Sequence, residues 1–481
     1  MKKANYLYIA ALVVASSCTK NITDLNNNPK SPVTAPSTAV FLAAEKNFMD
    51  ACTSSDIASS PYRVLAQSWT ECSYTTEARY NLAAYNAPGG WWNKLYTTVI
   101  NNLEQAKGLY GTDVADAGAR RNDLIITDIL EIYAWHSLVT CYGNIPYSQS
   151  ENRTIPFPKY DDAKTIYTDL LTRLDTCIAG LNTGSGSLGA QDQIYNGDVG
   201  HWKKFAATLK LKMALLIADK DAATASKKVL EAIATGVFTS NGDNAAMPYD
   251  KSSTNTSNPV WQTIINSGRH DFLPASFMVN TMKGWNDPRI PFYYALNGQP
   301  DFVGGTAGAG NSFNSFSTFS AQWTDPSYPG DFLDYSETEF LLAEAVERGI
   351  AVPGTAESHY DNAVAASIIF WGGIGTDAAA YLAQPGVAYT TAAGSWRQKI
   401  GYQKWIAFAN RNYDSWLEIR RLGYPNLDVV SPPVGANGNL PLRFNYPPAE
   451  QTNNAANWAA AVKAVTGGSA DVLSAKLWFM Q

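Results

Sequence analysis

The stretch GHWKKFAATLKLKMALLIADKDAATASKKVLEAIATG, residues 200–236, decides the expected fold of this chain. Residues 200–217 place Trp202 and Leu209 on one helical stripe, and a short polar turn leads to a second helical run at 222–235. Small residues stand where two packed helices must approach each other closely: Ala214, Ala225 and Ala232. The stretch therefore predicts a pair of helices packed against each other.

The same periodicity returns along most of the chain. It predicts helices at 91–109, 121–141 and 160–181, a second pair at 335–348 and 356–371, and a long amphipathic segment at 395–421. Such pairs resemble tetratricopeptide units of roughly 34 residues, although here the spacing is irregular and long insertions separate the pairs. We therefore expect a mostly α-helical fold, a single helical-repeat domain over residues 37–481.

Two long stretches interrupt the helical pattern. Residues 237–334 are rich in Gly, Ser, Asn and Thr with aromatic residues between them, and residues 423–454 contain six Pro. Loops of this length inside a folded domain are usually functional or disordered. We expect ligand contacts in these irregular insertions and in the region 74–90.

The N-terminus has the features of an export signal. A short basic start precedes the apolar run YLYIAALVV (6–14), which is followed by ASSC (15–18). The apolar run is about half of the ~20 residues that a membrane-spanning helix needs, so residues 1–17 are predicted to be a signal peptide. ASSC resembles the bacterial lipobox, which implies that Cys18 becomes a lipidated N-terminus; the alternative is an ordinary signal with an incidental Cys. The Asn- and Pro-rich residues 18–36 are expected to form a flexible tether.

The charge balance argues against nucleic acid as a partner. The net charge is −6 and there is no run of Lys and Arg, whereas phosphate binding needs concentrated positive charge. Aromatic residues make up 12% of the chain, including 14 Trp and 26 Tyr. Most of these rings must be buried, but so large a number leaves some to contact a ligand.

Cysteine usage leaves two alternatives open. Beyond Cys18, the chain contains Cys52, Cys72, Cys141 and Cys177. The absence of a CxxC pair disfavours a zinc ribbon or a thioredoxin-like site. In an oxidising compartment one disulfide is an option, for example Cys52 with Cys72. Free buried thiols are the alternative, and the spacing does not decide between them.

No constellation of catalytic residues is visible. The four His lie far apart without metal-ligand spacing, and the GxSxG, GxxxxGK[ST] and GxGxxG motifs are missing. We therefore expect no metal and no cofactor, and nothing indicates a structural calcium ion. A binding protein is expected rather than an enzyme. A lipid-anchored glycan hydrolase is an alternative, because its two carboxylates need not be close in sequence.

A series of motifs runs through the chain: CYGNIPY (141–147), PKYD (158–161), YNGDVGHWKKF (195–205), EFLLAEA (339–345), QKWIA (403–407), WLEIRRLGYP (416–425) and RFNYPPAEQ (443–451). In this order they resemble the SusD/RagB family of outer-membrane nutrient-binding lipoproteins. The resemblance covers almost the whole chain. It implies a mostly α-helical fold in which four tetratricopeptide-like pairs carry an irregular second half.

The resemblance also implies a function. Members of this family bind glycans, or in some cases peptides, and pass them to a TonB-dependent outer-membrane barrel on which they sit as a lid. We therefore expect a lipid-anchored protein of the outer membrane, facing the cell surface, that binds an oligosaccharide without covalent chemistry. The third hypothesis, after the hydrolase, is a scaffold that binds another protein through its helical repeats.

Aromatic rings outside clean helical stripes are the candidates for ligand binding, because sugars stack their apolar faces on such rings. They are Trp323, Tyr74, Trp91, Trp92, Tyr80 and Trp69. Trp323 is the first choice, since it ends a Gly/Ser/Phe loop with no periodicity to bury it, and Tyr74 and Trp91 follow. For Trp69, Tyr80 and Trp92, a place in the core is the alternative interpretation.

Overall fold

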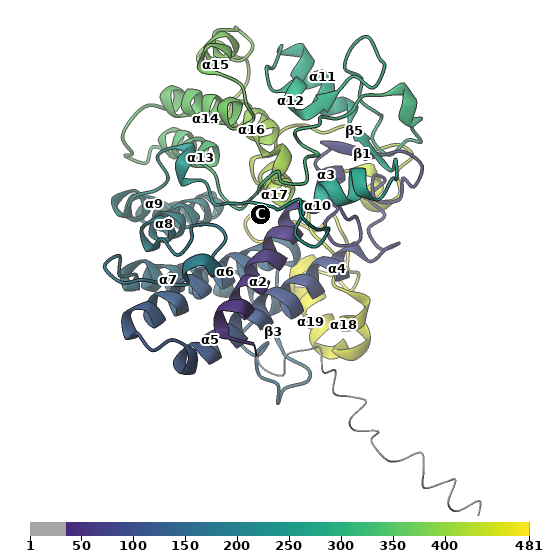
Figure 1. The fold of residues 1–481 in the computed structure, drawn as a ribbon. Helices are drawn as coiled ribbons and strands as arrows, with labels where there is room; N and C mark the ends of the chain where they lie inside the picture. The colour runs from purple at the N-terminus through teal and green to yellow at the C-terminus, as the bar shows by residue number, and fades with distance from the viewer. Residues whose placement is uncertain (1–34, 481) are drawn as a thin grey trace, which may run out of the picture. The chain divides into compact units, whose positions relative to one another are not determined.

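Four pairs of packed helices follow one another up the ribbon in Figure 1, from α5 near the bottom to α14 near the top. The structure, a computed structural model, describes residues 35–480; the predicted signal peptide, Cys18 and most of the tether lie outside them. The pairs are α2 (Ser37–Thr53) with α5 (Asn101–Asp113), α6 (Ala117–Tyr142) with α7 (Ala163–Gly180), α8 (Val199–Leu216) with α9 (Ala222–Thr235), and α13 (Tyr335–Glu347) with α14 (Ala356–Phe370). The predicted fold class, mostly α-helical with tetratricopeptide-like pairs, is confirmed.

Aspartate caps explain where several of these helices begin. The Asp198 carboxylate accepts hydrogen bonds from the backbone N–H groups of Gly200 (2.8 Å) and His201 (3.0 Å) at the start of α8. Asp221 accepts one from Thr224 (3.0 Å) at the start of α9. Each cap satisfies backbone N–H donors that have no partner inside the helix. The residues next to each helix therefore determine where it begins.

The predicted amphipathic segment at 395–421 is not one helix. It forms α16 (Trp396–Ala407), a 3₁₀ turn at Phe408–Asn410, and α17 (Asn412–Leu422). The chain leaves helical geometry at Arg411, whose φ and ψ are −116° and 65°. The break lets the buried Arg411 guanidinium reach Glu337 on α13 (2.5 Å) and Asp414 on α17 (2.6 Å).

Buried ion pairs join α13, α16 and α17. Arg421 forms a bidentate pair with Glu344, at 2.5 and 2.6 Å, and contacts Glu418 at 2.6 Å. Lys404 contacts Glu418 at 2.8 Å. The cations hold the pKa of Glu418 and Glu344 below the usual value against the opposing effect of burial. Two of the sequence motifs, EFLLAEA and WLEIRRLGYP, thus meet as ion-pair partners in the helical core.

The irregular region 237–334 is tied down by short strand pairs and helices. In Figure 1, α11 (Ser276–Gly284), α12 (Ile290–Tyr293) and β5 (Phe272–Pro274) gather beside α3 (Tyr62–Leu65) and β1 (Trp69–Glu71). The antiparallel pairs are β1 with β5, β2 (Ile145–Pro146) with β3 (Tyr160–Asp161), β4 (Ala246–Met247) with β8 (Gly330–Asp331), and β6 (Tyr294–Ala295) with β7 (Thr318–Phe319). Remaining helices are α4 (Ala87–Asn93), α10 (Pro259–Trp261), α15 (Gly375–Leu382), α18 (Pro448–Asn453) and α19 (Ala455–Thr466).

Helix α6 is the central buried element of the helical half. Among the described residues it alone is long and apolar enough to cross a membrane, but 83% of its most apolar window is buried inside the fold. That burial is typical of a core helix.

The four cysteines of the described region are free thiols, and all are buried. Of the two alternatives that the sequence left open, a disulfide or free buried thiols, the structure shows free buried thiols. Burial raises the pKa of the Cys141 and Cys72 thiols to about 12, so they behave as small apolar core residues.

Candidate ligand-binding cleft

Trp323, the first choice from the sequence, is fully buried at 0% exposure. Its ring lies 5.5 Å from those of Trp69 and Trp371, and the Arg63 guanidinium lies over both Trp69 (4.7 Å) and Trp323 (5.4 Å). The exposure expected of Trp323 is therefore wrong. The short strands and helices of region 237–334 build a core without helical periodicity, and this ring is at its centre.

Three further candidate rings also belong to the core. Trp91 and Tyr80 are 0% exposed and Trp92 is 6% exposed. Trp91 stacks on Tyr413 with 5.7 Å between ring centroids, and Trp92 meets Tyr142 edge to face at 4.9 Å. With Trp69 at 1% exposure, five of the six rings selected from the sequence are packing residues in this structure.

Tyr74 is the exception, with 61% of its side chain exposed. It lines a cleft of about 640 Å³, a size within the range of about 300–1,000 Å³ that is usual for small-molecule sites. The cleft is bordered by residues 55–58, by residues 71–85 and by residues 262–272. The cleft brings together two of the three regions in which the sequence predicts ligand contacts, residues 74–90 and 237–334; no residue of 423–454 lines it.

The pairing of β1 with β5 creates this cleft. Glu71 lies opposite Phe272 in the antiparallel register, and the Cys72 N–H donates to the Asp271 carbonyl oxygen at 2.8 Å. Two segments about 200 positions apart in sequence therefore share one edge. The sequence does not predict this pairing of β1 with β5, because strands of three residues are too short to show a periodicity.

Beside the two walls that β1 and β5 bring together, the cleft has a third wall, the turn at residues 55–58 that follows α2. Asp56 shapes it by accepting a hydrogen bond from the Ser59 hydroxyl at 2.8 Å. The turn lies directly on α4, where a Cβ atom at Gly90 would stand 1.8 Å from the Ala58 carbonyl oxygen. Only glycine permits this approach, so Gly90 has a structural role beside the cleft. The helix predicted to begin after Gly89-Gly90 begins earlier, at Ala87, and contains both glycines.

Tyr85 is a second exposed ring in the cleft, at 57% exposure. It stands in the turn before α4, which ends at Asn86 in the left-handed region (φ 53°), where the Asn86 side chain accepts from the Gly89 N–H. Among the residues that the structure describes, neither Tyr74 nor Tyr85 has a hydrogen-bond partner for its hydroxyl. Both rings are free to contact a ligand by face and by hydroxyl.

Polar groups surround the two rings. Arg269, 62% exposed, forms an ion pair with Asp271 at 2.6 Å. The Gln262 amide donates to the carbonyl oxygens of Thr254 and Ser257, which orients the side chain and leaves its own carbonyl oxygen available. The cleft therefore presents donors and acceptors beside aromatic faces.

Two buried carboxyl groups also line the cleft. Glu71 is 4% and Glu77 is 1% exposed. Burial, together with the charges of Glu77 and Asp271, raises the pKa of Glu71 to about 8, although the Ala78 N–H donates to it at 2.9 Å. Burial raises the pKa of Glu77 to about 7. At neutral pH Glu71 therefore keeps its proton.

Sequence reasoning missed Tyr85, Gln262, Arg269, Glu71 and Glu77. Tyr85 satisfies the rule that selected Tyr74, since it is an aromatic residue outside a clean helical stripe, and it could have been found. The others depend on the β1–β5 contact. Within residues 35–480, no group of three His, Cys, Asp or Glu side chains is placed to hold a metal ion.

Comparisons with known proteins agree with this architecture. A SusD-like family model, described as starch-binding and associating with the outer membrane, matches residues 27–447. A solved structure of a chitin-binding protein is 25% identical, with a TM-score of 0.77 over 91% of this chain and 99% of that one.

Two further solved structures share the fold. A chitin-binding SusD homologue from Flavobacterium johnsoniae is 24% identical, with a TM-score of 0.79 over 92% of this chain and 98% of that one. A SusD homologue from Bacteroides uniformis is 23% identical, with a TM-score of 0.77 over 92% and 99% of the two chains. No curated protein matches the sequence.

Proposed function

The chain belongs to the SusD-like family, and we propose that it is a nutrient-binding protein that captures an oligosaccharide in the cleft around Tyr74 and Tyr85. The observation that carries the proposal is the pair of exposed tyrosine rings, 61% and 57% exposed, in a cleft lined with polar side chains. A structural relative at 25% identity is named a chitin-binding protein, which supports a glycan as the ligand.

The chemistry of the cleft suits a sugar. The apolar face of a pyranose ring stacks on an exposed aromatic ring, and such a contact contributes about 1–2 kcal/mol. Hydroxyl groups of the sugar would accept from Arg269 and donate to the Gln262 carbonyl oxygen or to Asp56.

We propose that the protein binds the oligosaccharide without cleaving it. A glycosidase places two carboxyl groups on either side of the scissile bond. Glu71 and Glu77 are 4% and 1% exposed, and Glu71 is held by the Ala78 backbone N–H. Side chains so deeply buried do not flank a bond of a sugar that lies on exposed rings.

The test uses the purified full-length chain with maltooligosaccharides and chitooligosaccharides as probes, by isothermal titration calorimetry. Tyr74→Ala and Tyr85→Ala should each weaken binding about tenfold, the equivalent of about 1.4 kcal/mol, without lowering the melting temperature. Phe157→Ala is the matched control, because Phe157 is exposed to the same 57% as Tyr85 and lies outside the cleft.

Full affinity in both tyrosine variants would show that this placement of the ligand is wrong. The same samples are analysed for shorter sugars after prolonged incubation. Their release by the wild-type chain, and its loss in Glu71→Gln, would assign the protein to the hydrolases instead.

Anchoring and delivery complete the proposal. We infer that Cys18 carries acyl chains, which at about 0.8 kcal/mol per buried methylene hold a protein durably at a membrane, and that the ligand passes to a TonB-dependent outer-membrane barrel. Cys18→Ala should abolish labelling by a fatty-acid analogue and release the protein from the membrane fraction. Cross-linking of the wild-type chain on intact cells should recover a barrel protein, and recovery of none would remove the delivery step.

A further inference from the structure

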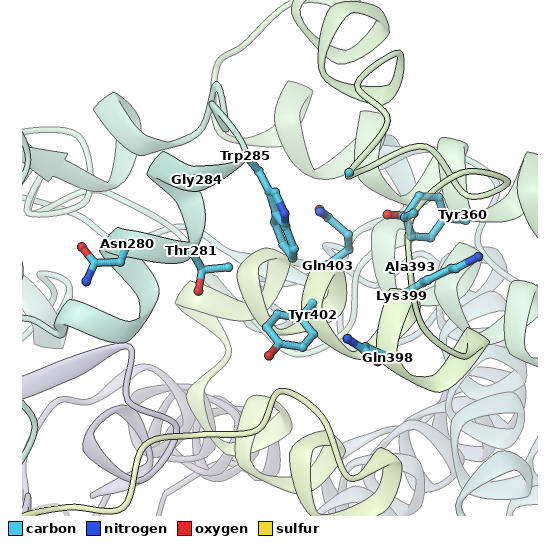
Figure 2. Close-up of a pocket in the computed structure, with 12 residues that line it drawn as sticks. Asn280, Thr281, Gly284, Trp285, Tyr360, Ala393, Gln398, Lys399, Tyr402 and Gln403 are labelled. Atoms are coloured by element: carbon cyan, nitrogen blue, oxygen red, sulfur yellow. The ribbon is translucent and has the colours of Figure 1, made fainter.

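A second pocket, of about 320 Å³, lies between α11 and α16. Its walls are the end of α11 with Trp285, the segment 386–393 that follows α15, and one face of α16 (Figure 2). None of the residues that line it lines the Tyr74–Tyr85 cleft. It is therefore a separate feature that the proposed function does not use.

Three aromatic residues line this pocket: Trp285 and Tyr402, and the buried Tyr360. In Figure 2, Trp285 extends from the end of α11 toward α16, and Tyr402 on α16 lies below it. Their centroids are 5.6 Å apart with an angle of 69° between the ring planes. Both rings are half-buried, so each has one part fixed by packing and another part open to the pocket. Edge-to-face packing at this separation brings the two rings into contact with each other, so a ligand would lie against their open surfaces and not between them.

Two polar side chains of the pocket wall are bonded within the protein. Gln403, 2% exposed, donates to the Tyr381 hydroxyl at 2.8 Å and accepts from Arg289 at 2.9 Å. Lys399 is also occupied, since its ammonium group donates to the Tyr389 carbonyl oxygen at 2.7 Å and lies 5.1 Å from the Tyr389 ring. The pocket wall is thus pre-formed, and its one ammonium group is already bonded within the protein.

Two polar groups in the pocket have no partner. Among the residues that the structure describes, the Trp285 indole N–H and the Gln398 side-chain amide take part in no hydrogen bond. Gln398 is half-buried on α16, four positions before Tyr402 and therefore on the same face of the helix. Together they offer three N–H donors and one carbonyl acceptor beside the two rings.

We infer that this pocket is a second saccharide-binding site, which takes one or two sugar rings. Its volume is at the lower end of the range for ligand pockets, about 300–1,000 Å³, which is too small for a long chain. The Lys399 ammonium group donates one hydrogen bond to the Tyr389 carbonyl oxygen and keeps further N–H groups that a sugar hydroxyl can accept from. A purely apolar ligand would leave the indole N–H and the Gln398 amide unpaired. A hydroxylated ring satisfies all of these groups.

The inference goes beyond the proposed function, because it requires neither Tyr74 nor Tyr85. The test therefore starts from the full-length Tyr74→Ala/Tyr85→Ala double variant, in which the first cleft is disabled. Maltose and N,N′-diacetylchitobiose are the probes, and binding is measured by saturation-transfer NMR and by calorimetry. We expect residual binding of a disaccharide in this background.

Adding Trp285→Ala to the double variant should reduce that residual affinity at least tenfold, and adding Gln398→Ala, a milder change on the helix surface, should reduce it several-fold. Trp396→Ala is the matched control, because Trp396 is on the same helix but does not line the pocket. It should leave the residual binding unchanged. If Trp285→Ala fails to fold, Gln398→Ala alone decides the result.

The outcomes separate the two proposals. Wild-type binding that disappears completely in the double variant overturns the second site and supports the first. Residual binding that neither Trp285→Ala nor Gln398→Ala alters also overturns the second site. Loss caused by Trp285→Ala alone, with the tyrosine variants fully active, supports the second site and overturns the first. If no probe binds to the wild-type chain, both are overturned.

Discussion

Two buried glutamates show how differently the two halves of this molecule treat charge. Glu337 on α13 is 0% exposed and contacts Arg411 at 2.5 Å and Lys212 at 3.1 Å. These cations hold its pKa near 2 in spite of burial. Glu71 at the cleft is 4% exposed, but its charged neighbours are Glu77 and Asp271, and its pKa rises to about 8.

The opposite pKa shifts of Glu337 and Glu71 reflect different roles of buried charge in the two regions. In the helical half, neighbouring helices place cations opposite buried carboxylates, and the charges serve to join α8, α13, α16 and α17. At the cleft the carboxyl group is buried without a cation and keeps its proton instead, as buried acids do when no partner is supplied. Perturbed groups of this second kind are typical of functional sites.

The largest effect is expected from breaking the helical network. Glu337→Ala removes a buried carboxylate that Arg411 and Lys212 share, and leaves Asp414 as the partner of both. Removal of one member of a buried ion pair costs about 3–5 kcal/mol. We expect the upper end of that range in the free energy of unfolding, measured with urea. A loss of less than ~1 kcal/mol would mean that the network does not anchor the helices.

A smaller loss of stability is expected at the centre of the second core. Trp323→Ala should cost toward the lower end of the ~3–5 kcal/mol range for large aromatic truncations, because the buried indole N–H of Trp323 has no hydrogen-bond partner to lose. Glycan affinity should stay unchanged in the folded fraction. A folded Trp323→Ala protein that has specifically lost binding would restore this ring as a ligand contact.

The smallest effect is expected in the pH dependence of stability, which should have opposite signs for Glu71 and Glu337. Because the pKa of Glu71 is raised to about 8 from a usual value of 4.5, its contribution to stability is complete below pH 4.5 and is lost as the pH rises through 8. Glu71→Gln should therefore gain stability relative to the wild type over this window, by at least about 1.4 kcal/mol, the equivalent of one pKa unit.

Glu337→Gln should show the opposite slope. The lowered pKa of Glu337, about 2, means that its contribution is present above pH 4.5 and is lost as the pH falls toward 2. Thermal melts of both variants and the wild type across pH 3–9 measure the two slopes. Parallel curves for Glu71→Gln and the wild type between pH 5 and 8 would contradict the contrast between the two regions.

Local sequence patterns determined the helical half. The stripe of Trp202 and Leu209 and the capping aspartates Asp198 and Asp221 each act within one or two helical turns, so they can be read without knowing the rest of the chain. The motifs that identify the family lie mostly in this half, and Trp202 is buried as its stripe predicts. The signal peptide predicted at residues 1–17 lies outside the described residues.

Only the tertiary structure decided where the cleft lies and which rings face it. Trp323 and Tyr74 both stand in irregular, loop-like sequence, yet one is 0% and the other 61% exposed. The position of Tyr74 depends on the pairing of β1 with β5, and the burial of Trp323 depends on its contacts with Trp69 and Arg63. Both are contacts between segments that are far apart in the sequence. Exposure is a property of the whole packed chain, and strands of two or three residues leave no periodicity from which it can be predicted.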